Sequence, residues 1–387
     1  MPDPCGVEKN PINRSKFDTK HTDMKITHKK SALMLAALVS SSLPLLAADL
    51  PKPDGKPADM TKPVQVFLIM GQSNAVGMAK LSGTGKGLSL EQAVKTEKLY
   101  PFLVDDAGNW LERKDVRNVQ VMVGRGGGMG RLRNEWLGEA FTTGKGGGTL
   151  GIEYGVGHQL GNALSEPVML LKSCIGNRSL GWDLLPPGSK GYDFTSKDKT
   201  GKEVTYTYAG YKESPMKWEK GTEPVKIGWY AGKQWDDDIA NAKTVLTELD
   251  KHYPGATKYE VAGFFWWQGE KDCGDEGLSA HYEDNLVNLI KALRKEFNSP
   301  NGKFVMGTLG ESAKGGTGNG GQVLEAMLAV DGKSGKHPEF KGNVATVYTH
   351  DMARGGSGNG HYGLDSRVYM DVGLSMGEAM NDLLKTK

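Results

Sequence analysis

The sequence predicts an α/β domain of three layers, in which helices cover both faces of a mostly parallel central sheet and glycine-rich loops are inserted between the elements. Three observations predict this class. Six nearly continuous apolar runs have the length of strands that are buried on both faces. Amphipathic helical patterns separate most of these runs. The 54 glycines among 387 residues indicate long, turn-rich connections, because glycine usually makes up about 7% of a protein.

The first expected strand, residues 64–70, reads VQVFLIM, and its side chains are apolar on both faces. Five later runs share this character and are expected to be strands: residues 118–123, 168–173, 261–267, 303–309 and 344–349. Because helical patterns lie between most of them, we expect these strands to pair in parallel.

The clearest helical pattern covers residues 281–297, where apolar residues recur at i, i+3, i+4, i+7 and i+11 and form one stripe. Three more helices are expected at residues 153–164, 236–249 and 365–384. Together with the strands, they give the alternation of a sheet that is covered on both faces.

Four segments interrupt this alternation. Residues 124–148, 314–321 and 355–360 are rich in glycine and are expected to form loops. Residues 191–232 are polar and aromatic, and we expect them to hold a hairpin. These segments are therefore predicted to be insertions on a single scaffold.

The N-terminal region has the pattern of a secretory signal. A basic segment at residues 24–30 precedes an apolar stretch at residues 31–46, and small residues stand before Asp49. We expect cleavage near Ala48 and a secreted or periplasmic protein, with either Met1 or Met24 as the translation start. An uncleaved membrane anchor is the alternative, although the apolar stretch is shorter than the ~20 residues of a span.

The expected domain organisation follows from this pattern. Residues 1–48 form a leader, residues 49–62 a polar linker, and residues 63–387 one domain with an insertion at about 191–232. Residues 1–48 hold seven basic and four acidic residues, so 41 basic and 42 acidic residues remain in the mature chain. This balance argues against nucleic acid as a partner and against a membrane partner after signal cleavage.

The first strand leads directly into Gly71-Gln72-Ser73-Asn74, and the next residues could open a helix. Open parallel sheets place their sites at the carboxyl ends of their strands. At a helix N-terminus, Ser73 would lie near free backbone N–H groups, which suits a nucleophile whose attack creates an oxyanion. The alternative is that Ser73 only caps the helix.

Two further strand ends carry polar residues. The fourth strand ends in Trp266-Trp267-Gln268-Gly269-Glu270, where Gln268 can donate an amide N–H and Glu270 can accept a proton. The third ends in a segment with Gly176, whose backbone could approach the same centre closely. The alternatives are core tryptophans, a solvated Glu270 and an ordinary turn. Among the histidines, His350 and His361 follow the last strand, where a base could face the turn that holds Ser73.

In this order, Ser73, Gly176, the QGE segment at 268–270 and His361 resemble the carbohydrate esterase family 6 branch of the SGNH hydrolases, the sialate O-acetylesterase and acetylxylan esterase group. The similarity extends over most of the mature chain, from about residue 64 to residue 380. Its motif blocks are GQSN, GIE at 151–153, SCIGNRSLGW and WWQGEKD. The resemblance implies an SGNH-hydrolase-like (flavodoxin-like) fold.

The resemblance also implies roles for individual residues. Ser73 would be the nucleophile and His361 the general base. The backbone N–H groups of Ser73 and Gly176 would form an oxyanion hole with the Gln268 amide. The superfamily usually has Asp three residues before the base, but residue 358 is glycine here. Glu270 is therefore the expected acid, with Asp351 in reserve.

Substrate and chemistry are expected from the same resemblance. The substrate would be an O-acetylated carbohydrate, either acetylated xylan-type polysaccharide or O-acetyl sialic acid, and an acetyl-serine intermediate needs no metal or cofactor. The candidate substrate-binding residues are Gln72, Asn74, Glu153, Asn177 and Trp182. The resemblance brings Cys174 and Cys273 near the site, where a disulfide is expected between them. The alternative function is a catalytically impaired glycan-binding protein on the same scaffold.

Overall fold

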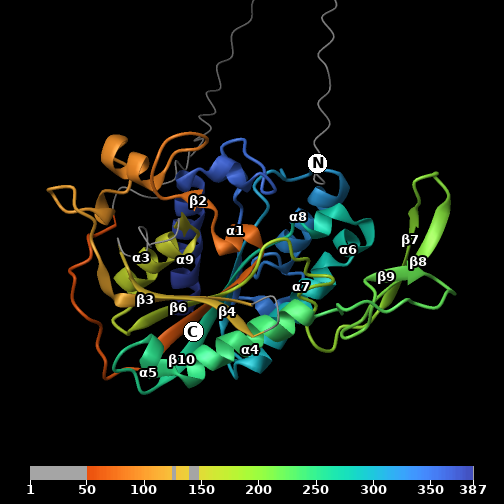
Figure 1. The fold of residues 1–387 in the computed structure, drawn as a ribbon, viewed down its shortest axis with the longest axis horizontal. Coiled ribbons are helices and arrows are strands. Elements are labelled where there is room, and N and C mark those ends of the chain that lie inside the picture. The colour runs from red at the N-terminus through yellow and green to blue at the C-terminus, as the bar shows by residue number, and fades with distance from the viewer. Residues whose placement is uncertain (1–49, 124–127, 139–147, 387) are drawn as a thin grey trace, which may run out of the picture.

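A computed structural model describes residues 50–123, 128–138 and 148–386 (Figure 1). The expected signal peptide and its cleavage site lie outside these residues, as do most of the glycines predicted to form a loop at 124–148. Within the described ranges, no helix combines the length and the apolar character needed to cross a membrane.

The central sheet has seven strands. In spatial order they are β12 (Val344–Val347), β11 (Lys303–Gly307), β10 (Tyr259–Trp267), β1 (Val64–Gly71), β6 (Val168–Ser173), β3 (Arg113–Val123) and β4 (Met129–Leu137). The six strands expected from the apolar runs are all present, and they pair in parallel. Only β4 is antiparallel, at the edge beside β3.

Helices cover both faces of the sheet, which confirms the predicted three-layer α/β/α class. One face packs on α4 (Lys233–Thr247), α7 (Tyr282–Glu296) and α8 (Gly318–Val330). The other packs on α3 (Glu153–Ala163) and α9 (Ser366–Lys385).

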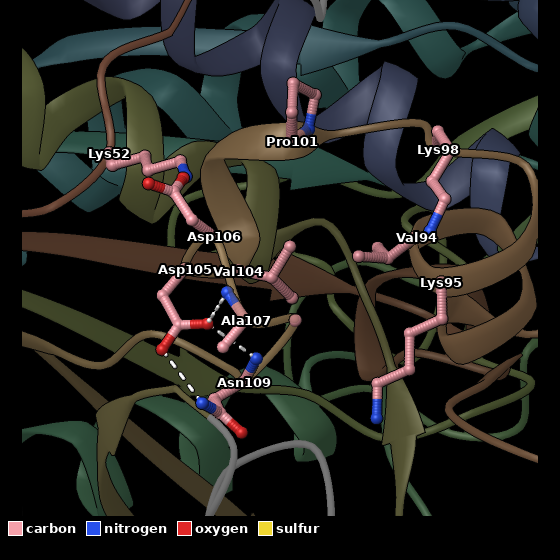
Figure 2. A pocket seen from close by; sticks show the side chains of 11 residues that line it. Lys52, Val94, Lys95, Lys98, Pro101, Val104, Asp105, Asp106, Ala107 and Asn109 are labelled. Carbon is pink, nitrogen blue, oxygen red and sulfur yellow. Dashed lines mark hydrogen bonds and ion pairs between the residues drawn. The ribbon is translucent and has the colours of Figure 1, made fainter.

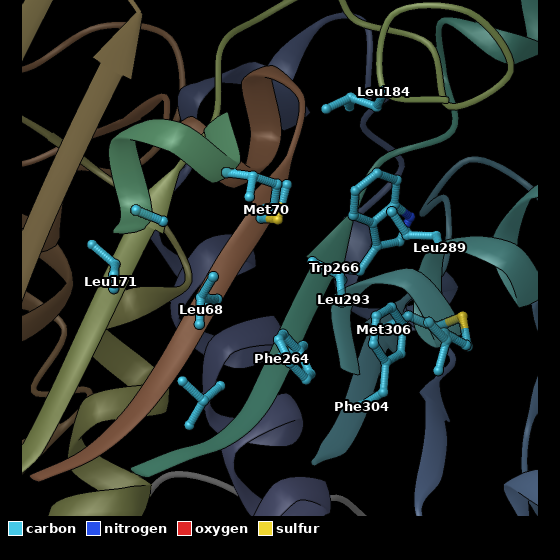
Figure 3. Close-up of a cluster of buried hydrophobic side chains, with 14 of the residues drawn as sticks. Leu68, Met70, Leu171, Leu184, Phe264, Trp266, Leu289, Leu293, Phe304 and Met306 are labelled. Carbon is cyan, nitrogen blue, oxygen red and sulfur yellow. The ribbon is translucent and has the colours of Figure 1, made fainter. Parts of the chain in front are cut away.

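Successive residues of β1 point to opposite faces of the sheet and contribute to two separate hydrophobic clusters. Leu68 and Met70 belong to the first hydrophobic cluster, whereas Phe67 and Ile69 belong to the second. This alternation is the reason that the sequence of β1 reads as apolar throughout. Figure 3 shows Leu68 and Met70 in the first cluster, with Phe264 and Trp266 of the neighbouring strand β10.

Short elements complete the domain. They are α1 (Ser73–Val76), β2 (Ala79–Lys80), β5 (Thr149–Leu150), α5 (Leu249–His252) and α6 (Glu276–Ala280).

The segment expected to hold a hairpin forms a separate antiparallel sheet of β7 (Tyr192–Lys197), β8 (Glu203–Tyr208) and β9 (Lys217–Glu219). In Figure 1 this sheet extends away from the central one. Its base is attached to α6, because Tyr208 Oη donates to Asp275 at 2.6 Å and Lys217 forms an ion pair with the same carboxylate at 2.5 Å. The insertion is thereby fixed beside the carboxyl end of β10.

The disulfide expected between Cys174 and Cys273 does not form. Both residues are buried, but Cys174 packs in the cluster with α3 and α9, and Cys273 packs in the cluster with α4 and α7. Because a disulfide requires the two Cα atoms to lie within about 7 Å, cysteines that pack in cores on different faces of the sheet are not positioned to form one.

Candidate active site

The predicted site residues gather at the carboxyl edge of the central strands. β1 lies between β10 and β6, and Gly71 at its end is opposite Trp267 in the parallel register. The turn that holds Ser73 therefore lies next to the segment after β10, and the segment after β6 approaches it from the other side.

Gly71 makes the turn into Ser73 possible. Its φ is +144°, and an ideal Cβ at this position would lie 2.2 Å from the carbonyl oxygen of Trp267. Ser73 then begins α1, a single helical turn that ends at Val76. The N-cap is Gln72, so Ser73 is not a cap residue. Within the described part of the chain, the half-buried Ser73 hydroxyl makes no hydrogen bond.

Gly176 lies beside Ser73. A Cβ built on Gly176 would lie 3.4 Å from the Ser73 Cβ. With no side chain at 176, the backbone of this segment can approach a group bound at Ser73. The structure thus brings together two of the three residues expected to form an oxyanion hole.

Gln268, the third of these residues, is placed differently. Its amide nitrogen lies within hydrogen-bond distance of Gln72 Oε1 (3.1 Å), the carbonyl oxygen of Arg178 (2.9 Å) and Asp272 Oδ2 (2.6 Å). An amide has only two N–H bonds, and these internal acceptors occupy both of them. The buried Gln268 side chain therefore links Gln72, Arg178 and Asp272 beneath the site, and it does not donate to a group at Ser73.

Asp272, to which the sequence reasoning gave no role, connects two of these segments. Its carboxylate accepts the backbone N–H groups of Leu180 (2.8 Å) and Gly181 (2.9 Å) as well as the Gln268 amide. Burial raises the pKa of Asp272 to about 7. The residue ties the segment after β6, which carries Gly176, to the end of β10. The position of Asp272 at the end of the WWQGEKD block is the sequence signal from which a role in the site could have been predicted.

Glu270 is fully buried and lies against the backbone of Gly358. A Cβ built on Gly358 would lie only 2.2 Å from Glu270 Oε1, so the carboxyl group fills the space of a side chain at 358. Asn74 Nδ2 donates to Glu270 Oε1 at 2.6 Å and to the carbonyl oxygen of Gly358 at 3.1 Å. Burial, together with the charge of Glu311, raises the pKa of Glu270 well above its usual value.

His361 lies three residues beyond Gly358, in a left-handed turn. Residues 361–364 have φ values of 49°, 48°, 67° and 64°, a conformation that costs roughly 1–2 kcal/mol for each non-glycine residue. The half-buried imidazole has a lowered pKa because of desolvation. Among the described residues, neither Ser73 nor a carboxylate forms a hydrogen bond with this ring. The structure thus brings the backbone of Gly358, three residues before His361, against Glu270, but forms no hydrogen bond between the imidazole and Ser73.

Asp351, the reserve acid, is not part of this arrangement. It is exposed on the turn formed by residues 350–353 and makes no ion pair or hydrogen bond in the described part of the structure. Of the two acids expected from the sequence, Glu270 is therefore the one that the structure places beside the segment leading to His361.

A pocket of about 370 Å³ opens next to these groups. Its lining includes three of the five expected substrate-binding residues, Gln72, Asn177 and Trp182, and Met216 from the insertion. Asn359, two residues before His361, also lines it. The pocket therefore joins the turn at Ser73 to the base of the insertion.

Asn74 and Glu153, the other two expected substrate-binding residues, are buried. Asn74 accepts a hydrogen bond from Tyr369 on α9, at 2.8 Å, in addition to its donation to Glu270. Glu153 forms a buried ion pair with Lys172 at 2.5 Å, and Lys172 donates to the carbonyl oxygen of Val76 at the end of α1. Both residues support the turn at Ser73 from below and do not face the pocket.

A larger hollow of about 640 Å³ lies elsewhere, between Lys52 and the segment 94–109 (Figure 2). Its carboxylates already have partners: Asp105 accepts two backbone N–H groups and the side-chain amide of Asn109, and Asp106 pairs with Lys52. None of the residues predicted from the sequence lines this hollow.

Comparison with known proteins gives a family match and several structural likenesses. The model of the family described as carbohydrate esterase, sialic acid-specific acetylesterase matches residues 211–382. No curated protein matches the chain.

The similar solved structures are distant. One is a protein from Arabidopsis thaliana, with 18% identity, a TM-score of 0.46, and coverage of 84% of this chain and 100% of that one. A second is described as a carbohydrate acetylesterase from Xanthomonas citri, with 16% identity, a TM-score of 0.44, and coverage of 82% and 54%. A third, NanS, has 15% identity, a TM-score of 0.38, and coverage of 74% and 78%.

Proposed function

The resemblance to the carbohydrate esterases is confirmed over residues 211–382, and from this premise we propose that the protein is a serine esterase that removes acetyl groups from O-acetylated sugars. One observation carries the proposal. At a single edge of the sheet, an unbonded serine hydroxyl meets a glycine backbone, and a buried carboxyl group lies against the segment that leads to a histidine. These are the parts that acyl transfer through serine requires.

In the proposed reaction, the Ser73 oxygen attacks the acetyl carbonyl carbon while His361 takes the hydroxyl proton. The backbone N–H groups of Ser73 and Gly176 donate to the oxyanion that forms, and each such donor contributes roughly 10²–10³ in rate. The C–O bond to the sugar then breaks, and the leaving oxygen receives the proton from His361. Water attacks the acetyl-serine in the second half, with the same base, and acetate leaves.

This reaction requires the His361 imidazole to turn toward Ser73 when substrate binds. Hydrogen bonds of catalytic groups are commonly long or unformed in the absence of substrate and tighten in the complex. The left-handed turn at 361–364 supports the proposal, because backbone strain of this kind collects at functional sites.

Glu270 is the proposed acid. Its carboxyl group takes the space that a side chain at position 358 would occupy, which supports its acting in place of the aspartate that the superfamily usually has there. In this role Glu270 orients the segment that carries His361 and stabilises the imidazolium formed when Ser73 attacks.

The proposed substrate is an O-acetylated sugar held in the pocket of about 370 Å³. Trp182 supplies an aromatic surface for a sugar ring, and Asn177 and Gln72 supply polar contacts. We propose acetylated xylan-type polysaccharide or O-acetyl sialic acid as this substrate, and secretion or export to the periplasm as the location.

The second candidate is a glycan-binding protein that has lost catalysis. The imidazole of His361, which forms no hydrogen bond with Ser73 or with a carboxylate among the described residues, is the observation that favours it. Such a protein would bind the sugar but would not cleave its esters.

Acetate release separates these two functions. The wild type and Ser73→Ala are incubated with acetylated xylan and with O-acetyl sialic acid, and binding of the same ligands is measured by calorimetry. The esterase proposal expects release by the wild type and at least ~10³-fold less by the variant. Equal rates for the two proteins would reject Ser73 as nucleophile, and binding without release by the wild type would favour the second candidate.

A further inference from the structure

Glu311 follows the end of β11 and lies beside the segment that leads to His361. On the basis of the proposed function, we propose that Glu311 is a positioning residue for the reaction, which holds the segment carrying His361 and sets the charge state of Glu270. The resemblance assigns no role to this residue. Its position at the carboxyl end of a neighbouring strand places it at the same sheet edge as Ser73 and Glu270.

The first contact is made through the backbone of Gly358. Glu311 Oε2 accepts the Gly358 N–H at 2.9 Å. The carbonyl oxygen of the same residue accepts from Asn74 Nδ2 at 3.1 Å and from the backbone N–H of His361 at 2.9 Å. Gly358 is therefore held on one side by Glu311 and on the other by Asn74, and the hydrogen bond to His361 transmits this position to the base.

The second contact is electrostatic. Glu270 Oε1 lies where a Cβ of Gly358 would be, and Glu311 binds the N–H of the same glycine, so both carboxyl groups border one residue. Two carboxylates that border one residue repel each other when both are ionised, and burial of Glu270 strengthens this effect. The charge of Glu311 accordingly adds to burial in raising the pKa of Glu270.

The other groups around Glu270 do not remove this repulsion. Asp272 also raises the pKa of Glu270, while the hydrogen bond from Asn74 lowers it. Tyr362 and Tyr369 face the same region, and burial raises the pKa of both phenols, so they are neutral there. We therefore expect the two glutamates to retain one proton near neutral pH, and the charge of Glu311 to control the pH at which Glu270 ionises.

Two substitutions separate the two contacts. Glu311→Gln keeps an oxygen that can accept the Gly358 N–H but removes the charge. Glu311→Asp keeps the charge but is one methylene shorter, so it withdraws the acceptor. Asp331→Asn is the matched control, because Asp331 also accepts a backbone N–H from a distant segment, that of Thr346 at 2.6 Å, away from the site.

The readouts are hydrogen exchange at the Gly358 amide and the pH profile of p-nitrophenyl acetate hydrolysis. Glu311→Asp is expected to accelerate exchange at Gly358 and to lower kcat at least ~10-fold with little change in KM, because the base is displaced. Glu311→Gln is expected to keep the exchange protection and to move the acidic limb of the profile down by about one pH unit. The control should change neither.

The inference is overturned by a Glu311→Asp protein with wild-type exchange at Gly358, or by a Glu311→Gln profile that coincides with that of the wild type. A wild type without esterase activity would reject the proposed function instead. Glu311 would then be judged by exchange at Gly358 and by the ¹³C titration of the Glu270 carboxyl in wild type and Glu311→Gln. An unshifted titration would reject the charge effect, and a shift to lower pH would support it.

Discussion

The carboxyl group of Glu270 occupies the space in which a side chain at Gly358 would lie, with Oε1 only 2.2 Å from the position of a Cβ there. The relationship links a buried acid on the segment after β10 to a loop near the end of the chain. It explains why residue 358 is glycine while a carboxyl group is still present at that point of the site. The two positions are therefore expected to be coupled in mutagenesis.

Gly358→Ala should lower kcat strongly, because the methyl group would displace either Glu270 or the segment that leads to His361. We expect a loss on the order of 10²-fold, as for other small displacements of catalytic groups. Steady-state kinetics of ester hydrolysis measures the effect. Gly228→Ala is the matched control, since a Cβ there meets no atom within 4 Å.

The same coupling predicts a partial rescue. Glu270→Ala removes the acid, and Gly358→Asp alone places a second carboxyl group in occupied space. The double variant Glu270→Ala/Gly358→Asp frees that space and supplies a carboxylate from the loop, so it should be more active than either single variant. A double variant no better than the poorer single one would show that the two positions are not alternative sources of one acid.

Asp272→Ala should lower the free energy of unfolding by more than the removal of a charge alone would. The change leaves the N–H groups of Leu180 and Gly181 buried without an acceptor, at about 1–3 kcal/mol each. Denaturant unfolding measures the loss, which we expect to reach about 3 kcal/mol. Asp198→Ala is the matched control, since Asp198 also accepts two backbone N–H groups but is only partly buried. Similar losses in the two variants would contradict this account.

Stability should fall as the pH rises from about 6.5 to 8. Burial raises the pKa of Asp238 and Asp272 to about 7, so the native state keeps protons that the unfolded chain releases at much lower pH. This stabilisation is lost progressively as the pH rises from about 4 through 7, and the last part of the loss lies above about pH 6.5. The pKa of buried His158 is lowered, so this residue changes stability only below about pH 6.5. In that range the unfolded chain binds a proton that the native state does not, and stability falls as the pH is lowered. Thermal unfolding across this range tests the slope, and Asp238→Asn should flatten it.

Gly176→Ala should fold normally but turn over more slowly. The new Cβ would make an ordinary contact with Ser73 at 3.4 Å, which the fold can accommodate. It would also occupy space where a bound acetyl group approaches the oxyanion donors, so we expect kcat to fall while the melting temperature stays within a few degrees. If the variant had the kcat of the wild type, the oxyanion would have to form at a position away from Gly176.

Strand runs and strand ends could be predicted because they depend on local sequence. The apolar run that became β1 is buried on both faces, and that environment leaves a clear pattern. β4 was not predicted, since an edge strand with polar residues such as Asn134 and Glu135 has no continuous apolar run. Helix α8 was also missed, because it begins in the glycines at 318–321, which indicate a loop.

The site was harder to predict in its details, because side-chain partners depend on distant segments. The motif at the end of β10 was found, but its sequence does not show that the Gln268 amide is occupied by Gln72, Arg178 and Asp272. Glu311 could have been found by applying the strand-end argument to the run that became β11. Tyr369 gave no local signal, since a tyrosine on the last helix is usually part of the core.

The central claim is that Ser73 carries the acetyl group during turnover. The most direct measurement is rapid quenching of the enzyme with an acetylated substrate, followed by peptide mass spectrometry to locate the acetyl group. The account predicts acetylation on the peptide that contains Ser73, and a longer-lived acetyl-enzyme in a variant in which deacylation is slowed, such as Glu270→Gln. Turnover with the acetyl group on another residue, or with unmodified Ser73 throughout a pre-steady-state burst, would contradict it.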